Sequence, residues 1–484
     1  MRVLGWLSLW LFFCIANAKT EFSPKLAQSY EFLYKLILDS AQILIRRNEQ
    51  SEPDNEVNKF MYSYVEFIRI LLSEDNLVYS QWQNRFNLRI NAFKAIADAS
   101  PYKQYLLGEM YIKSSILKFK FGDQVGALID FKKGYSFLAS NEKDFPNFPY
   151  HKKTLGFIHI VLSYIPNKYK WVLHTFGFGT NFDKGKFQLQ AALQNEVATK
   201  YEAFFLVQWL NIIFDDKTGE SLKAMAEFAK QHPDFVVAKW SLIMALKNEN
   251  RVEEALEISS QMKPNSGFYF SPYFYFVNGQ MQLFRGNYEK STSEMQLFIV
   301  HYKGKMLRQS AFYFMYLSDY LQQKPDKLGM YKDSVLNTPE SGSEQDRVAK
   351  KVLLENPTPT LEILKARLYY DGGYFDKSLA AIDRLQPNTI ADTRESIEYF
   401  YRKARLLEKR NDNTNALKFY QLTIKKQGKG AYYFAPNSYL LMAKIVKDDN
   451  LDLAKNYLKK IDNYDGYEYQ PAIEYQAKAL LKKL

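Results

Sequence analysis

Apolar and polar positions alternate with a helical period through most of the chain. Residues 26–48, 55–73 and 78–98 repeat apolar side chains three and four positions apart, and this spacing predicts amphipathic helices. No convincing run shows the strict two-residue alternation of a half-buried strand. Residues 323–345 contain two prolines and a Ser-Gly-Ser run, which predicts a loop. The pattern therefore predicts an all-α chain.

A column of small residues adds a longer period. Four of the six spacings between its successive members are 34 to 38 residues, close to the tetratricopeptide period of about 34. The two longer gaps leave room for degenerate units. The members are Ala127, Ser221, Ala255, Ser291, Ser378, Ala416 and Ala454.

Residues at three fixed distances from these seven small residues are also similar to one another. The residue five positions earlier is always Gly, Asn or Asp, which best tolerate the left-handed turn that ends a helix. The residue four positions later is large in six of seven cases, and the residue twelve positions earlier is small at Ser115, Gly279, Ala366 and Ala404. This register predicts helical hairpins in which the second helix packs its small residue against the first. The predicted turn residues are Gly122, Asp216, Asn250, Gly286, Gly373, Asn411 and Asp449.

The expected fold is an all-α, tetratricopeptide-like solenoid of helical hairpins, wound as a right-handed superhelix. Its first third is less regular than the rest. We therefore divide the chain into residues 1–18, an irregular helical region over 19–200, and a repeat array over 201–484 that continues from it.

The first eighteen residues have the pattern of a secretory signal peptide. Arg2 supplies a positive start, residues 3–15 are apolar, and Ala16-Asn17-Ala18 resembles a signal-peptidase site. Thirteen apolar residues are too few for a retained membrane anchor, and Phe12 and Phe13 stand where a lipoprotein signal needs small residues. Cleavage would remove Cys14, the only cysteine. We expect an exported protein that is periplasmic or associated with the cell envelope.

Two segments resemble a known family. Residues 155–189 contain a glycine-led apolar helix, an Ile-Pro break and two later glycines, and residues 432–484 end in a repeat, a tyrosine-rich stretch and a basic helix. Both resemble the tetratricopeptide repeat protein 39 family of eukaryotes, and look closer still to exported bacterial relatives from Bacteroidetes-like organisms. The resemblance covers most of the mature chain loosely. It implies a helical repeat fold and no catalytic residue; the signal peptide departs from the eukaryotic members, so their cellular roles are not carried over.

No motif indicates catalysis, a cofactor or a metal. The five histidines lack H-x-x-x-H and H-E-x-x-H spacing, and residues 177–182 imitate a dinucleotide motif but carry Phe182 at the third glycine position. Ser115 and Lys118 fit an S-x-x-K pattern that has no S-D-N or K-T-G partner. The paired carboxylates lie near predicted helix ends, where capping is their expected role. We therefore predict a non-enzymatic protein with no cofactor and no metal.

Aromatic residues and positive charge suggest partners. Residues 268–276 include seven aromatics, which either pack between repeats or line the concave groove as a partner site. The net charge of +12 favours acidic partners, although dispersed lysines are also expected on a solvated surface, and nucleic acid is a poor candidate for an exported chain.

The predicted function is a protein-binding scaffold or adaptor of the bacterial cell envelope, whose partner lies in the concave groove. One alternative is an all-helical envelope enzyme, or enzyme subunit, acting on a glycan or small molecule. Another is a peripheral outer-membrane assembly factor. The residues predicted to bind the partner are Tyr269, Tyr273, Tyr275, Arg402 and Arg405.

Overall fold

The computed structural model describes residues 20–165, 177–179, 181–195, 197–214, 217–264, 267–355, 360–387, 390 and 392–484. Within these ranges it contains 24 α-helices and no strand, which confirms the predicted all-α class. The predicted signal peptide lies outside the described residues. Of the helices in the described ranges, none is both long and apolar enough to span a membrane.

The helices are short and follow one another closely. The first group is α1 (Pro24–Tyr34), α2 (Leu38–Ser51), α3 (Val57–Ser73), α4 (Asn76–Ala95), α5 (Pro101–Lys120), α6 (Gln124–Asp144), α7 (Tyr150–Ser163) and α9 (Phe182–Gln194). The middle group is α10 (Lys200–Phe214), α11 (Thr218–Gln231), α12 (Val236–Asn248), α13 (Val252–Ser260), α14 (Tyr273–Arg285), α15 (Tyr288–His301), α16 (Arg308–Leu321) and α17 (Leu328–Asn337). The last group is α18 (Glu344–Glu355), α19 (Leu361–Gly372), α20 (Phe375–Ile382), α21 (Thr393–Lys409), α22 (Asn413–Gln427), α23 (Phe434–Val446), α24 (Leu451–Lys460) and α25 (Gln470–Lys483). Two short 3-10 turns lie at Pro325–Lys327 and Ile461–Asn463.

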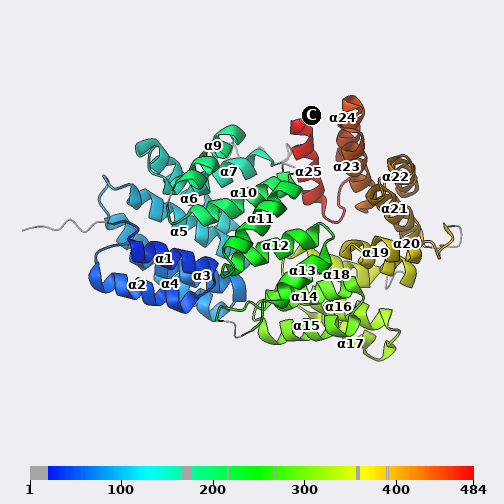
Figure 1. The fold of residues 1–484 in the computed structure, drawn as a ribbon, viewed down its shortest axis with the longest axis horizontal. Coiled ribbons are helices and arrows are strands. Elements are labelled where there is room, and N and C mark those ends of the chain that lie inside the picture. The colour runs from blue at the N-terminus through cyan, green and yellow to red at the C-terminus, as the bar shows by residue number, and fades with distance from the viewer. Residues whose placement is uncertain are drawn as a thin grey trace, which may run out of the picture.

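Consecutive helices pack as pairs, which is the arrangement of a helical-hairpin solenoid. Figure 1 shows the pairs following one another from α1–α4 at one end, through α10–α12 in the middle, to α21–α24 at the other end. The last helix, α25, turns back and contacts α10. The predicted solenoid of hairpins is therefore confirmed.

The register of small residues is reproduced in the structure. Each of the seven is the fourth residue of the second helix in its pair, and each is buried. Ser291 and Ser378 use their hydroxyls to join the two helices, donating to the carbonyl oxygens of Gly279 and Ala366 at 2.8 and 2.6 Å. A Cβ at Gly279 would lie 2.8 Å from Met295 Cε, so a larger side chain there would push the helices apart.

The predicted turn residues take the conformation that their chemistry favours. Gly122, Gly286 and Gly373 have φ values of 92°, 91° and 83°, and Asn250 and Asn411 both have 60°. In four hairpins the next residue is an Asp or Asn whose side chain caps the following helix. Two positions differ from the rest, because Asp449 is not left-handed and Asp216 lies outside the described residues.

The first hairpin corrects one prediction. Residues 26–48 form two helices, α1 and α2, rather than one, because the chain turns at Leu36 with φ = 52°. Leu36 stands five positions before Ala41, the buried fourth residue of α2, and Ser29 donates to the Ala41 carbonyl at 3.0 Å. The hairpin thus follows the common register, with a leucine at the turn position. Leucine disfavours the left-handed conformation, and burial of its side chain compensates for that cost.

The predicted loop over 323–345 also contains a helix. The ten residues of α17 pack against α16 and bury Tyr331 and Val335. The prolines lie outside this helix, one in the preceding 3-10 turn and one after its end. The proline signals therefore marked the ends of a short helix, and tertiary burial stabilised the residues between them.

Segments far apart in sequence also contact one another directly. Lys35 forms an ion pair of 2.7 Å with Asp234, and the Tyr269 amide donates to the Leu36 carbonyl at 2.8 Å. At the other end, Lys482 of α25 donates to the Ser163 carbonyl at 2.6 Å. The first hairpin is therefore fixed against the middle of the chain, and α25 is fixed against α7 and α10.

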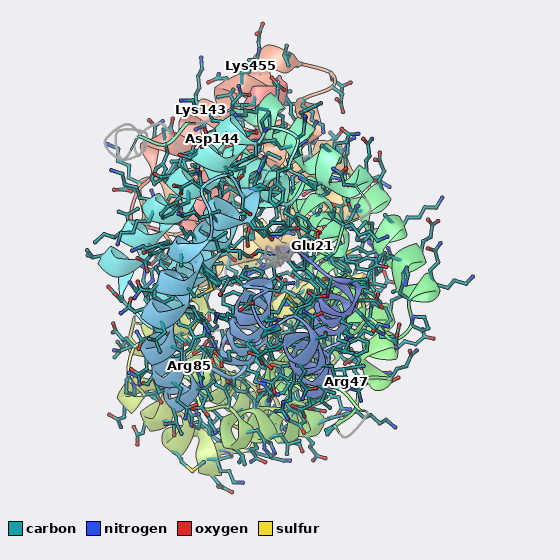
Figure 2. The ribbon with its side chains drawn as sticks, turned by 90° about the vertical axis from the view of Figure 1, so that its left-hand side faces the viewer. Glu21, Arg47, Arg85, Lys143, Asp144 and Lys455 are labelled. Carbon is teal, nitrogen blue, oxygen red and sulfur yellow. The ribbon has the colours of Figure 1, made fainter. Side chains whose placement is uncertain are left out.

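Exposed charges are spread over the outer face. Figure 2 views the molecule from the side of the first helices and shows Arg47, Arg85 and Lys143 among many charged side chains there. This dispersion is typical of a solvated surface, so the outer face alone does not point to one acidic partner.

Candidate binding site on the inner helices

The first helices of the later pairs contact one another directly and form what we call the inner row. It consists of α12, α14, α19, α21 and α23: α19 contacts α12, α14 and α21, and α21 contacts α23. Because these contacts run between pairs, side chains from several repeats meet along one surface.

Five charged residues of the inner row form what we call the arginine cluster. Arg367 and Asp371 lie one turn apart on α19, and Glu398, Arg402 and Arg405 lie one turn apart on α21. Residues three and four apart share one face of a helix. The charged face of α19 and the charged face of α21 therefore lie on the same inner surface.

Arg402 is fully engaged within the protein. Its Nε and Nη2 donate to Glu398 Oε1 at 3.0 and 2.8 Å, and Nη2 also donates to the Tyr433 hydroxyl at 2.9 Å. Arg402 and Glu398 are each only 4% exposed. The pair is thus a buried salt bridge whose two charges compensate each other.

Arg405 is held by aromatic residues instead of a carboxylate. Its Nε and Nη1 donate to the hydroxyls of Tyr370 and Tyr401 at 3.1 Å each, and its guanidinium carbon lies 4.5 Å from the centre of the Tyr370 ring. Both tyrosines are buried, whereas Arg405 is half-buried. Two hydrogen bonds and the cation–π contact thus hold the guanidinium in place without neutralising its charge.

Arg367 has no such partner. Among the described residues, the half-buried Arg367 side chain makes no ion pair and no hydrogen bond. The neighbouring Tyr313 is 7% exposed, and its hydroxyl also lacks a hydrogen-bond partner within the described part of the chain. A buried polar group without a hydrogen-bond partner costs free energy, so the Tyr313 hydroxyl beside the half-buried Arg367 is the unusual feature of the site.

The electrostatic balance of the cluster favours positive charge. Burial raises the pKa of Asp371, although Arg402, Arg367 and Arg405 act in the opposite direction. Burial also raises the pKa of Glu398, but the nearby arginines lower it by more, so this carboxyl stays ionised at neutral pH. Burial lowers the pKa of Lys247, whose ammonium donates to Gln280 at 2.9 Å, to about 8.

This arrangement suits binding rather than catalysis. A guanidinium presents five donors in a planar fork that matches a carboxylate or phosphate. No serine, histidine or lysine nucleophile with a neighbouring base forms part of the cluster. In the described residues no group of three or more His, Cys, Asp or Glu side chains is placed to hold a metal ion.

The predicted partner-binding residues fall in three places. Arg402 and Arg405 belong to the arginine cluster, and Tyr269 and Tyr273 lie where the first hairpins meet the middle of the chain. Tyr275 lies within the middle of the chain, against His301 of α15. The structure does not bring these groups into one site. Their role in partner binding remains a prediction.

Each of the three tyrosines makes contacts within the protein. The Tyr273 hydroxyl bonds Glu74 Oε1 at 2.6 Å and the Tyr302 hydroxyl at 2.8 Å, and Glu74 is paired with Lys120 at 2.5 Å. Tyr269 is half-buried beside α1, and Tyr275 stacks on His301 with ring centres 5.7 Å apart.

Sequence reasoning missed Arg367 although a signal was present. Arg405 directly follows Ala404, a small residue of the first-helix column, and Arg367 directly follows Ala366 in the preceding repeat. The two arginines are therefore equivalent positions of consecutive hairpins. Gln280 follows Gly279 in the same way and holds Lys247.

A second charged group, which we call the sealed cluster, lies among the first helices. Lys113 pairs with Glu109 at 2.7 Å, and Lys153 pairs with Glu202 at 2.9 Å and with Glu109 at 3.6 Å. Glu109, Lys113 and Lys153 are at most 4% exposed. Burial raises the pKa of Glu109, but the two lysines lower it by more, so both charges of each pair persist.

Hydroxyl groups complete the sealed cluster. Tyr30 donates to Glu202, and Thr154 donates to Glu109. The Lys113 ammonium also lies 4.1 Å from the centre of the Tyr64 ring. Two cations and two anions are thus matched and hydrogen-bonded, and this cluster is a structural core element.

Comparison with known proteins adds two distant structures. No protein-family model and no curated protein sequence matches the chain. A structure of an IFIT1 monomeric mutant with Gppp-AAAA is 14% identical over 93% of this chain and 97% of its own, with a TM-score of 0.33. The tetratricopeptide domain of P58(IPK) is 12% identical over 88% of this chain and 98% of its own, with a TM-score of 0.21. The fold assignment therefore rests on the helix pairs and their register.

Proposed function

We propose that the protein is a non-catalytic scaffold that binds a partner protein along its inner row. The observation that carries the proposal is Arg367, a half-buried guanidinium without an internal partner, in a surface built from several repeats. Repeat proteins bind through such extended surfaces, because neighbouring units align equivalent side chains. Arg405, fixed by two buried tyrosines, occupies the equivalent position in the next repeat.

We further propose that the scaffold acts in the cell envelope of a bacterium. The support is the pattern of residues 1–18, with its positive start, apolar stretch and small residues before the cleavage site. Amino-terminal sequencing of the protein purified from its native host tests this. A mature chain that starts at Lys19 and fractionates with the envelope is expected, whereas an intact amino terminus in the cytosol would refute it.

Site-specific crosslinking tests the scaffold function. Benzoylphenylalanine is placed at Tyr469, which is 38% exposed beside Tyr433 of the inner row, or at Leu422, which is 42% exposed on α22. We expect one defined protein adduct from the Tyr469 position and none from the Leu422 position. The matched exposure of the two sites controls for general reactivity.

Two crosslinking outcomes would contradict the proposal. The same mixture of adducts at both positions, or no adduct at either, would contradict a partner surface on the inner row. Circular dichroism of each variant confirms that the helices are intact, so that a negative result refers to binding and not to folding.

A further inference from the structure

We infer that the arginine cluster recognises a carboxylate on an acidic peptide segment of the partner, with Arg367 and Arg405 as the contacting residues. This inference rests on the proposed scaffold function and specifies the chemistry that its partner presents. It follows from three features: the uncommitted donors, the charge balance, and the way the acidic segment before α25, residues 462–469, uses the neighbouring surface.

The first feature is the supply of hydrogen-bond donors. Arg402 directs its bonds to Glu398 and Tyr433, and Arg405 uses two nitrogens on tyrosine hydroxyls, but Arg367 uses none within the described chain. A half-buried guanidinium has lost part of its hydration. An acceptor that enters the site therefore regains hydrogen bonds that folding removed.

The second feature is charge. Three arginines and Lys247 face the carboxylates of Asp371, Glu398 and Glu408, which leaves one positive charge in excess. Asp371 makes no ion pair within 4 Å among the described residues. The cluster thus carries a net positive charge, although it contains acidic side chains, and would attract an additional anion.

The third feature is the chain's own tail. Glu468, which precedes α25, is 5% exposed and lies 3.5 Å from Arg394 of α21 and 3.4 Å from Lys351 of α18. Next to it, Tyr469 packs edge-on against Tyr433, with ring centres 5.6 Å apart. An acidic, aromatic segment therefore already lies against the neighbouring part of this surface.

The tail also explains why we favour a peptide carboxylate. Residues 467–469 read Tyr-Glu-Tyr, and they show that a short turn with one carboxylate and a neighbouring ring fits against α21 and the start of α23. Tyr433 links the two places, because its hydroxyl accepts from Arg402 while its ring contacts Tyr469. A partner segment of similar composition would continue from this point to Arg405 and Arg367.

A binding measurement on the full mature chain tests the inference. The probe is fluorescein-labelled hexaglutamate, followed by fluorescence anisotropy at about 150 mM salt, where long-range attraction between exposed charges is screened. Hexaglutamine serves as the neutral probe. We expect the acidic probe to bind and the neutral probe to bind at least about tenfold more weakly.

Three variants separate site recognition from overall charge. Arg367→Gln should weaken hexaglutamate binding about tenfold, because it removes the charged fork. Arg410→Gln changes the net charge equally but lies at the end of α21, exposed and paired with Asp376, and should change affinity less than about twofold. Asp371→Asn should tighten binding severalfold, because it removes a competing carboxylate.

Each other outcome overturns the inference. Equal weakening by Arg367→Gln and Arg410→Gln would show general charge attraction, and a looser or unchanged Asp371→Asn complex would show that the probe binds elsewhere. Competition by millimolar inorganic phosphate, but not by glutamate peptide, would assign the site to phosphate. If hexaglutamate does not bind while the Tyr469 crosslink persists, the scaffold function stands and the carboxylate assignment fails.

Discussion

The sealed cluster and the arginine cluster use the same kinds of side chain to opposite effect. In the sealed cluster, each lysine meets a carboxylate at 2.9 Å or less, and hydroxyls fill the remaining acceptor positions. In the arginine cluster, Arg402 has such a partner but Arg367 has none among the described residues. The difference teaches which group of buried charges stabilises the fold and which is available to another molecule.

Their surroundings explain the contrast. Helices α1, α3, α5, α7 and α10 all contribute to the sealed cluster or its tyrosines, so the cluster is enclosed on most sides and only Glu202, at 22% side-chain exposure, reaches water. In the arginine cluster Arg367 and Arg405 are only half-buried, and the segment before α25 contacts the row of helices at Arg394. Complete pairing is therefore needed in the first cluster, whereas the second can keep one charge half-buried.

The largest expected effect comes from breaking the sealed cluster. Lys153→Met leaves Glu202 and Glu109 with one cation between them, and an uncompensated buried charge costs about 3–5 kcal/mol. Urea unfolding followed by circular dichroism measures the free energy of unfolding. A loss below about 1 kcal/mol would show that water reaches this cluster and would remove the contrast with the inner row.

The second largest effect is a loss of stability at low pH, caused by protonation of Glu109 in the sealed cluster. The lysines hold the pKa of Glu109 below its ordinary value of 4.5, at about 2, so its contribution is complete above pH 4.5 and disappears as pH falls toward 2. We expect a loss of about 2–3 kcal/mol across that window. In Glu109→Gln, which is less stable at neutral pH, unfolding curves at several pH values should show a flatter dependence; an unchanged slope would contradict the assignment.

The frame that supports the arginine cluster can be tested at Gly373. Its φ of 83° suits glycine, and a Cβ would lie 1.8 Å from the Asn250 carbonyl oxygen, so Gly373→Ala should cost about 2 kcal/mol or more. Thermal unfolding measures the loss. Gly219→Ala is the control, because that glycine has no heavy atom within 4 Å of an added Cβ; equal effects would show that the turn carries no special constraint.

Arg367 should behave unlike Lys153 in the same assay. Arg367→Met removes a charge that makes no ion pair within the described residues and attracts Glu398 only at longer range, so the free energy of unfolding should change by less than about 1 kcal/mol, or rise. The comparison with Lys153→Met is direct, because both replace a buried or half-buried cation by an apolar side chain. A loss as large as that of Lys153→Met would mean that Arg367 stabilises the fold.

The smallest effect concerns Lys247. Because burial lowers its pKa to about 8, raising the pH from 7 to 9 removes one positive charge from the inner row. Hexaglutamate affinity should then fall about twofold, as expected for one charge acting through solvent at several ångströms. In Lys247→Met this dependence should disappear, and a decrease that persists would have to come from another group.

Much of the fold could be predicted because the repeat signals are local. A small residue, a turn residue five positions before it and a large residue four positions after it all lie within one hairpin. The structure buries all seven small residues and gives five of the seven turn residues the left-handed conformation. The division at residue 200 was not tested and stays a prediction. The turn at Leu36 could not be predicted, because leucine has no preference for a left-handed conformation. Only burial against other segments stabilises that conformation.

The candidate site could be predicted only in part. Arg402 and Arg405 were named from their place on a first helix, yet the sequence could not show that Arg402 is neutralised by Glu398 while Arg367 is not. The aromatic run suggested one surface, but Tyr273 bonds Glu74, 199 residues away. Contacts at such separations depend on how the whole array curves, which no local pattern contains.

By itself the sequence determined the helices, their pairing and the register of small and turn residues, because these depend on backbone preference and packing between neighbours in the chain. Which charges meet depends on contacts between segments that are distant in sequence. The tertiary structure placed Lys153 between two carboxylates, set Tyr469 against Tyr433, and left Arg367 on the inner row without an internal acceptor. The reason is physical: the free energy of a charge depends on the solvent and the counter-charges around it, and both are set by segments distant in sequence.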